Sequence, residues 1–439
     1  MTPIEECVLY RDFGEEEILY TMTSLMGAYE AKDEGLKSRQ GEFFCLAGRL
    51  AEMAGMYGFS GNLWHCYLTK LLVNHENAFS MACEIRGAVE GSVNALALHD
   101  FGIFKELYDF DMGAFDQVFG VDCCAILCHY ENTGIGGQMY NQRICDRICS
   151  MSRTLAAASG PKEFMEDMVQ FYKDFGVGKL GLHKAFRIGH DSQGKAKIVP
   201  ITRIAHVKLD DLVGYEIPKK KLIENTEAFV KGRKANNCLL FGDAGTGKSS
   251  SIKGILNQYY DQGLRIIEVY KHQFQDLNDI IAQIKNRNYK FILYMDDLSF
   301  EEFEIEYKYL KAVIEGGLEK KPDNILIYAT SNRRHLVREK ASDKLELADE
   351  NDLHSSDTVQ EKLSLVYRFG VRIYFGAPDK KEFQNIVTVL AERYGVRMPR
   401  EELLAEANKW ELSHGGLTGR TAQQFIDHIL GTMEAEDKR

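Results

Sequence analysis

Residues 239–251 read LLFGDAGTGKSSS, an apolar run followed by three glycines, a lysine and several hydroxyl side chains. Residues 242–249 fit the pattern G-x-x-x-x-G-K-[ST], which is typical of a loop whose main-chain N–H groups surround a phosphate. Lys248 would place a positive charge on the β- and γ-phosphate oxygens, and Ser249 would offer its hydroxyl to Mg²⁺. The predicted phosphate-binding residues are Gly242, Asp243, Ala244, Gly245, Thr246, Gly247, Lys248, Ser249 and Ser250.

A second pattern supplies the carboxylates that nucleotide hydrolysis needs. In FILYMDD, residues 291–297, an apolar run ends in paired acids. We expect Asp296 to hold the Mg²⁺ shell together with Ser249, and Asp297 to act as base for the attacking water. After the run NILIYA, the amide of Asn332 could orient that water. A strand followed by an acidic helix cap is the simpler alternative for the paired acids.

These motifs need a scaffold that brings strand ends together. From about residue 201, short β-type runs alternate with helical stretches, which predicts a parallel sheet covered on both faces by helices. The five predicted strands are 237–241, 265–269, 290–295, 324–329 and 371–375. Ligands of such sheets bind at the carboxyl ends of the strands.

The first part of the chain has a different sequence pattern. Residues 4–160 contain no proline, and apolar residues recur at spacings of three and four, which predicts packed α-helices. Nine of the ten cysteines precede residue 150. Spacings of four, as in Cys124 with Cys128 and Cys145 with Cys149, leave a metal or cluster site open. The lack of a C-x-x-C pair favours simple packing of reduced thiols.

Composition limits the remaining possibilities. The 439 residues exceed the size of one hydrophobic core, and 45% hydrophobic with 27% charged residues is typical of a folded, soluble protein. No apolar run approaches the roughly 20 residues that cross a bilayer, so we expect no membrane partner and a cytoplasmic location. The net charge is −11, and neither half has a global basic field, so a nucleic-acid partner is possible but not favoured.

Taken together, residues 207–432 resemble the AAA+ ATPases. This resemblance implies that Val213 and Gly214 lie near adenine, that Asn332 is a sensor-1 residue and that Arg420 is the sensor-2 arginine of a helical lid. It also implies that Arg368, in LSLVYRFG, is an arginine finger offered to a neighbouring subunit of a homo-oligomer. The texture of GLRIIEV, DDLSFE and GRTAQQFIDHIL is similar to that of the uncharacterised bacterial DUF815 family.

The resulting fold hypothesis is an AAA+ α/β core with a parallel five-stranded sheet and a C-terminal helical lid, preceded by a mostly α-helical domain. The expected divisions are a helical domain over 1–175, a connector over 176–206, the nucleotide-binding core over 207–378 and the lid over 379–439. The connector is rich in Gly, His and Lys, which predicts a boundary or a small hairpin-like segment.

Two departures from the AAA+ pattern restrict the function. Most AAA+ sites carry Asp-Glu where this chain has Asp296-Asp297, so the base must approach water one methylene closer. The segment YKHQFQDLNDIIAQI lacks the glycine of an aromatic pore loop, which disfavours substrate threading.

Three functions remain open at this stage. The first is an ATP- and Mg²⁺-dependent hydrolase that remodels or loads an unknown macromolecular client. The second is a nucleotide-gated binding module with little turnover. The presence of Asp297 in place of the usual glutamate favours this alternative. The third is a DNA-associated ATPase similar to helicase loaders.

Overall fold

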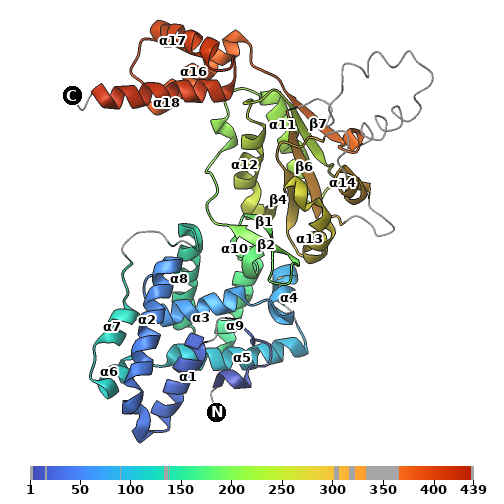
Figure 1. Ribbon diagram of the computed structural model, residues 1–439. Coiled ribbons are helices and arrows are strands. Elements are labelled where there is room, and N and C mark those ends of the chain that lie inside the picture. Colours follow the sequence, from blue (N-terminus) through green and yellow to red (C-terminus); the bar gives the residue numbers. More distant parts are fainter. Residues whose placement is uncertain are drawn as a thin grey trace. The chain divides into compact units, whose positions relative to one another are not determined.

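The computed structural model describes residues 3–14, 17–88, 90–132, 137, 139–300, 306–315, 322–332 and 365–436. The chain forms two compact units, Met1–His183 and Lys184–Arg439. Figure 1 shows helices throughout the first unit and a sheet flanked by helices in the second. None of the described helices has both the length and the apolar character needed to cross a bilayer.

The first unit is built from α-helices around an aromatic core. Its described α-helices of six or more residues are α1 (Glu17–Glu30), α2 (Gln40–Tyr57), α3 (Leu63–Asn74), α4 (Ala78–Arg86), α5 (Ser92–Asp109), α6 (Gly113–Phe119), α7 (Cys123–Cys128), α8 (Gln142–Ala157) and α9 (Pro161–Phe175). A short helix, α10 (Gly178–Leu182), ends the unit. Trp64, Phe104 and Phe164 are fully buried. Burial of such large rings dominates the stability of a helical core.

Helix starts in the first unit follow local capping rules. The Asn62 side chain accepts a hydrogen bond from the His65 N–H at the start of α3, and the Asn141 side chain accepts one from the Ile144 N–H at the start of α8. Each bond satisfies an N–H that has no partner within its helix.

A buried carboxylate attaches the N-terminal segment to α5. Asp100 of this helix accepts hydrogen bonds from the N–H groups of Val8, Leu9 and Tyr10 at 2.7–3.0 Å.

The second unit contains a seven-stranded sheet in the order β2-β1-β4-β5-β6-β3-β7. Its strands are β1 (Ala185–His190), β2 (Ala196–Ile201), β3 (Cys238–Gly242), β4 (Leu264–Glu268), β5 (Lys290–Met295), β6 (Ile325–Ser331) and β7 (Val371–Phe375). Strands β4, β5, β6, β3 and β7 are parallel along the sheet, as expected. The expected α/β core with a parallel sheet and a C-terminal helical lid is confirmed.

The expected number of five strands is wrong, because a hairpin extends the sheet. Strands β1 and β2 pair antiparallel, and β1 pairs parallel with β4. Phe186 and Ile188 of β1 are buried, and the Asp191 side chain accepts hydrogen bonds from two main-chain N–H groups of the turn. The glycines and lysines of this segment suggested a boundary or a small hairpin-like connector. The main chain of β1 in fact pairs with the edge of β4, which would otherwise be unpaired.

Helices cover both faces of the sheet and form the lid. Helices α11 (Glu216–Val230) and α12 (Lys248–Tyr259) pack on one face through Leu222, Phe229 and Ile255. Helices α13 (Leu277–Ile284) and α14 (Glu306–Glu315) lie on the other side of the sheet in Figure 1. The lid consists of α16 (Lys380–Tyr394), α17 (Arg400–Ser413) and α18 (Gly419–Glu436), which share a separate apolar core.

Candidate nucleotide-binding site

The loop between β3 and α12 forms a cradle of main-chain N–H groups. Gly242, Gly245 and Gly247 have φ angles of 133°, 74° and 88°, a region that residues with a Cβ rarely adopt. A Cβ on Gly242 would lie 2.1 Å from the carbonyl oxygen of Phe375 at the end of β7. Helix α12 begins at Lys248, directly after the loop. The positive end of this helix and the curled loop together favour an anion.

Lys248 lies at the centre of this cradle. Its Nζ donates hydrogen bonds to the carbonyl oxygens of Gly242 (3.0 Å) and Asp243 (2.6 Å), and the residue is buried. Burial lowers the pKa of the Lys248 ammonium, and the negative charges of Asp243, Asp297 and Asp296 offset only part of this effect. The Lys248 side chain is therefore held close to the loop by main-chain acceptors.

Asp296 stands at the carboxyl end of β5 and accepts hydrogen bonds from three hydroxyl groups. Its Oδ1 accepts from Ser249 Oγ (2.7 Å), Tyr294 OH (2.6 Å) and Thr330 Oγ1 (2.6 Å). Burial by itself raises the pKa of the Asp296 carboxyl, but the three donors stabilise the charged form more strongly, so the pKa lies below its usual value. Asp296 is thus held as an anion next to the serine of the phosphate loop.

Asp297 has an unusual backbone and an ordered side chain. Its φ angle is 50°, in the left-handed region where Asp and Asn are the most tolerated non-glycine residues. Its N–H donates to Thr330 Oγ1 (2.9 Å), and its Oδ1 accepts from Asn332 Nδ2 (2.9 Å). The tip of β6 therefore fixes both the backbone and the carboxylate of Asp297.

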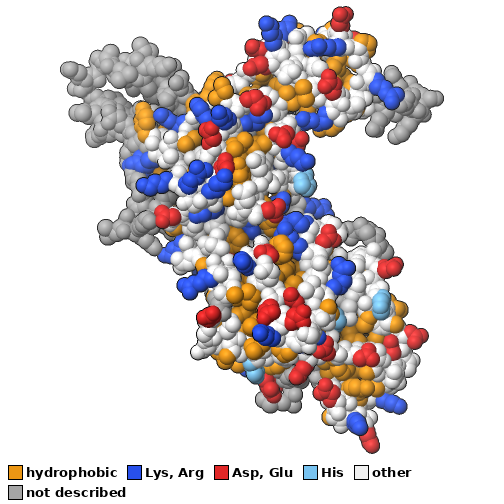
Figure 2. Space-filling view, turned by 180° about the vertical axis from the view of Figure 1, so that it is seen from behind, with side chains coloured by type: hydrophobic (Ala, Val, Ile, Leu, Met, Phe, Trp, Pro, Cys, Tyr) orange, Lys and Arg blue, Asp and Glu red, His pale blue; other side chains and the backbone are white. Residues whose placement is uncertain are grey.

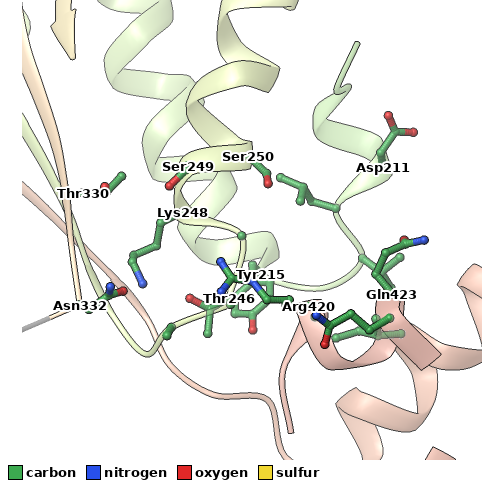
Figure 3. A pocket seen from close by; sticks show the side chains of 18 of the residues that line it. Asp211, Tyr215, Thr246, Lys248, Ser249, Ser250, Thr330, Asn332, Arg420 and Gln423 are labelled. Atoms are coloured by element: carbon green, nitrogen blue, oxygen red, sulfur yellow. The ribbon is translucent and has the colours of Figure 1, made fainter. Parts of the chain in front are cut away.

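The cavity above these residues has a volume of about 640 Å³, and the segment before α11 forms one of its sides. The phosphate loop and the ends of β5 and β6 form its floor, and α16 and α18 of the lid form one side. Figure 3 shows side chains of the phosphate loop, of α18 and of the segment before α11 directed at one space. The lining residues are Asp211, Leu212, Val213, Tyr215, Ala244, Gly245, Thr246, Gly247, Lys248, Ser249, Ser250, Asp296, Asp297, Thr330, Asn332, Ile386, Leu390, Gly419, Arg420, Gln423 and Gln424.

The lid packs directly on the phosphate loop. The Arg420 N–H donates to the Gly245 carbonyl oxygen at 3.2 Å, and a Cβ on Gly245 would lie 3.0 Å from Thr418 Oγ1. On the opposite side, Arg393 of α16 donates to the carbonyl oxygen of Asp211 at 2.9 Å. These contacts bring Arg420 to the mouth of the cradle.

Most of the residues predicted to form the site line this cavity, and a few do not. Gly214, Gly242 and Asp243 belong to the segments that form it but do not line it. Arg368 lies elsewhere: it precedes β7, at the amino end of the strand, whereas the phosphate loop follows the carboxyl end of the paired β3. Within one chain, the structure therefore does not bring Arg368 to the phosphate loop.

Several residues that line the cavity, or contact a residue that does, were not predicted from the sequence. Tyr294 lies two residues before Asp296, a spacing that puts both side chains on one face of β5 and could have indicated their contact. Thr330, like Asp296, directly follows an apolar run in the sequence, and this position could have indicated that Thr330 belongs to the site. Ile386, Leu390 and Gln423 come from the lid, and nothing in their spacing indicates a nucleotide site.

Thr330 tests how much this network supports the site. We expect Thr330→Val to lower the free energy of unfolding by about 1–3 kcal/mol, because the Asp297 N–H loses its acceptor and Asp296 loses a donor. The pKa of Asp296 should rise for the same reason. Urea unfolding measures the first effect. Thr388→Val is the matched control, since Thr388 only donates to a carbonyl of its own helix. Equal losses in both variants would contradict the expectation.

Comparisons with known proteins give partial matches. Over 74 residues, the chain is 35% identical to the replication factor C large subunit of Staphylothermus marinus. This match covers 17% of this chain and 17% of that protein. Among solved structures, a Thermotoga maritima RuvB mutant is 18% identical over 52% of this chain and 67% of its own, with a TM-score of 0.37. The AAA domain of FIGL-1 in complex with ADP is 16% identical over 53% and 76%, with a TM-score of 0.36.

These structural likenesses are weak, and the chain spans only about a sixth of the replication factor C subunit. The family match is much broader. A family model described as "Protein of unknown function (DUF815)" matches residues 182–433, more than half of the 439 residues. The similarity to this family that the motifs indicated is confirmed, and the chain belongs to the DUF815 family.

Proposed function

We propose that this chain binds ATP with Mg²⁺ in the cavity and hydrolyses it. The observation that carries the proposal is the 2.7 Å hydrogen bond between Ser249 Oγ of the phosphate loop and Asp296 Oδ1 at the end of β5. It joins a cradle for phosphate to a carboxylate, at one edge of a parallel sheet. This is the combination that phosphoryl transfer requires.

The donor set beside the cradle fits Mg²⁺. A hydroxyl and a carboxylate oxygen are ligands that Mg²⁺ accepts while it keeps several waters. Ser249 and Asp296 would hold the ion, and the bound ion would neutralise charge on the β- and γ-phosphate oxygens. The low pKa of Asp296 keeps this carboxylate charged for that role.

The remaining polar residues have separate roles in the proposal. Lys248 exchanges its main-chain acceptors for phosphate oxygens. Asp297 accepts the proton of the attacking water, and Asn332, which donates to Asp297 Oδ1 at 2.9 Å, positions this carboxylate. Arg420 adds a positive charge from the lid side. Each residue contributes orientation or charge stabilisation, which are the main terms in phosphoryl transfer.

The base-binding part is mainly apolar. Leu212 and Val213 line the cavity on one side, and Ile386 and Leu390, one helical turn apart on α16, line it on the other. Such side chains suit the two faces of a purine ring. The main chain of Val213 and Gly214 would then meet the ring edge, where hydrogen-bonding groups distinguish adenine from guanine.

A multiple-turnover assay tests the proposal. Purified full-length protein should release phosphate from ATP continuously with Mg²⁺, and EDTA should stop the release. A second candidate, a nucleotide-gated binding module, is favoured by the short Asp297 side chain, which is already hydrogen-bonded to Asn332. It predicts tight ATP binding with no turnover above the EDTA background.

In this proposal, the helical first unit binds the macromolecular client. Hydrolysis in the second unit would change how the first unit holds a macromolecular client, which is thereby remodelled or loaded. A DNA client is the weaker choice. Figure 2 shows acidic and basic side chains interspersed over the face in view, rather than one continuous basic surface. A DNA-binding titration across salt concentrations decides this point, and affinity that rises steeply at low salt would revive the DNA role.

We further propose that the protein acts as a homo-oligomer in which Arg368 serves the ATP of a neighbouring subunit. Its position at the amino end of β7, away from the loop of its own chain, supports a role in trans. Arg368→Ala is expected to lower kcat by about 10²-fold. The exposed Arg397 of the lid provides the matched control, since Arg397→Ala should leave kcat unchanged.

A mixing experiment separates action in trans from action within one chain. Lys248→Ala and Arg368→Ala subunits, each with little turnover alone, should regain turnover when mixed, because the first supplies Arg368 to the intact loop of the second. Light scattering with and without ATP shows whether mixed particles form. Mixed particles without recovered turnover would contradict the role of Arg368.

A further inference from the structure

Two cysteines from distant parts of the first unit are in contact. Cys66 lies on α3 and Cys149 on α8, and their Sγ atoms are 3.9 Å apart. Figure 1 shows α3 and α8 in the same helical unit, and the two helices pack against each other. At this separation, two sulfur atoms touch but are not bonded, since a disulfide requires about 2.05 Å. Both thiols are free.

The two thiols differ in access. A cavity of about 570 Å³ opens beside Cys149, which is half-buried and forms part of the lining, whereas Cys66 is fully buried and does not line it. The lining residues are Ser60, Gly61, Asn62, His65, Cys149, Ser152, Arg153, Ala156 and Ala157. A small molecule can therefore reach the sulfur of Cys149 first, with Cys66 directly behind it.

The surroundings also differ in their effect on the two thiols. The Cys66 S–H donates to the Cys149 sulfur and lowers its pKa, helped by the Ser60 main chain and the charge of Arg153, while burial and Asp146 oppose this shift. The pKa of Cys66 is raised, by its bond to Cys149 and by burial. Burial likewise raises the pKa values of Cys7, Cys83, Cys124 and Cys145. The accessible sulfur of the pair is thus the one that forms a thiolate more readily.

We propose that Cys149 and Cys66 form an oxidisable dithiol, in which a hydroperoxide reacts at Cys149 from the cavity and Cys66 closes a disulfide between α8 and α3. In the first step the Cys149 thiolate attacks the peroxide, the O–O bond breaks, and the leaving oxygen takes a proton and departs as an alcohol or water. Cys149 becomes a sulfenic acid.

In the second step the Cys66 sulfur attacks the Cys149 sulfur, and the hydroxyl leaves with the Cys66 proton as water. The two thiols lose two electrons in total, and one peroxide gains them. Ser152 assists this geometry, since its buried hydroxyl lies 3.6 Å from the Cys66 sulfur and donates to the Cys149 carbonyl oxygen at 3.0 Å. To form the bond, the two sulfurs must approach from 3.9 Å to about 2.05 Å.

A metal site is the main alternative for paired thiols. Across the part of the chain that the structure describes, however, no group of three or more His, Cys, Asp and Glu side chains is placed to hold a metal ion. The site also lies in a different unit from the nucleotide cavity. The proposal is therefore independent of ATP hydrolysis, and it can be tested whether or not the protein hydrolyses ATP.

Peptide mapping of the full-length chain tests the proposal. The reduced protein is treated with equimolar hydrogen peroxide, blocked with N-ethylmaleimide and digested with trypsin without reductant. Cleavage after Arg147 separates Cys145 from Cys149, so a Cys66–Cys149 link joins peptide 50–70 to peptide 148–153. We expect this linked pair as the main product. Cys45, an exposed thiol of α2, provides the internal control and should be oxidised roughly tenfold less.

Variants define the order of the two steps. Cys66→Ser should let Cys149 accumulate as a sulfenic acid that dimedone labels, whereas Cys149→Ser should leave Cys66 unoxidised. Cys45→Ser should form the link like the wild type. The wild-type map decides the matter even if a variant folds poorly. Full alkylation of Cys149 after peroxide, or its linkage to Cys145 instead, would overturn the proposal.

Discussion

Lys248→Ala is expected to weaken ATP binding and to lower turnover by about 10³-fold or more, because the only side-chain cation of the phosphate loop is lost. In the structure the Lys248 ammonium already lies against the carbonyl oxygens of Gly242 and Asp243, so a short movement brings it to bound phosphate. Titration with a fluorescent ATP analogue measures the binding, and phosphate release measures the turnover.

The controls for this substitution address folding and charge. Lys248 is buried, so Lys248→Met, which keeps most of the side-chain volume but removes the charge, should behave like Lys248→Ala. Lys220→Ala removes an exposed lysine of α11 and should change neither quantity. Unchanged circular dichroism spectra exclude unfolding. If the Lys248 variants bind ATP as tightly as the wild type, the proposed site is wrong.

Asp297→Asn is expected to lower kcat by about 10³-fold while the Kd for ATP stays nearly constant. Asparagine tolerates the left-handed backbone of this position, where φ is 50°. Its side-chain oxygen can still accept the hydrogen bond from Asn332 Nδ2. The substitution therefore keeps the geometry and removes only the ability to accept a proton.

The comparison with Asp296 makes this prediction specific. Asp296→Asn removes charge from the residue that accepts three hydroxyl donors, so it should weaken the dependence on Mg²⁺ as well as turnover. Steady-state rates at varied Mg²⁺ concentrations separate the two variants. A wild-type protein without turnover would favour the nucleotide-gated binding module, and an Asp297→Asn variant as fast as an active wild type would contradict the role of Asp297 as base.

The strand predictions illustrate which parts of the fold local sequence determines. Strands β5 and β6 are almost continuously apolar and almost entirely buried, as strands covered on both faces must be, so the sequence located them within one or two residues. The sequence suggested a small hairpin-like connector at β1 and β2, but it did not indicate that this hairpin belongs to the sheet. Its place in the sheet depends on pairing with β4, whose sequence lies more than 60 residues further on.

The candidate site shows the same division. The phosphate loop and the paired acids are recognisable because their chemistry requires particular residue types at short spacings. The contact of Thr330 with both aspartates instead follows from the strand order β5-β6-β3, which inserts the end of β6 between the acids and the loop. The order of strands in the sheet cannot be read from a short segment of sequence.

The sequence by itself determined that a loop for phosphate precedes a helix, that two acids follow an apolar strand and that helices dominate the first part of the chain. Each of these features depends on neighbours a few residues apart. Only the tertiary structure decided that Arg420 faces the cavity, that Arg368 does not, and that Cys66 touches Cys149. Such contacts arise when sheet order and helix packing bring distant segments together, and no local pattern encodes that geometry.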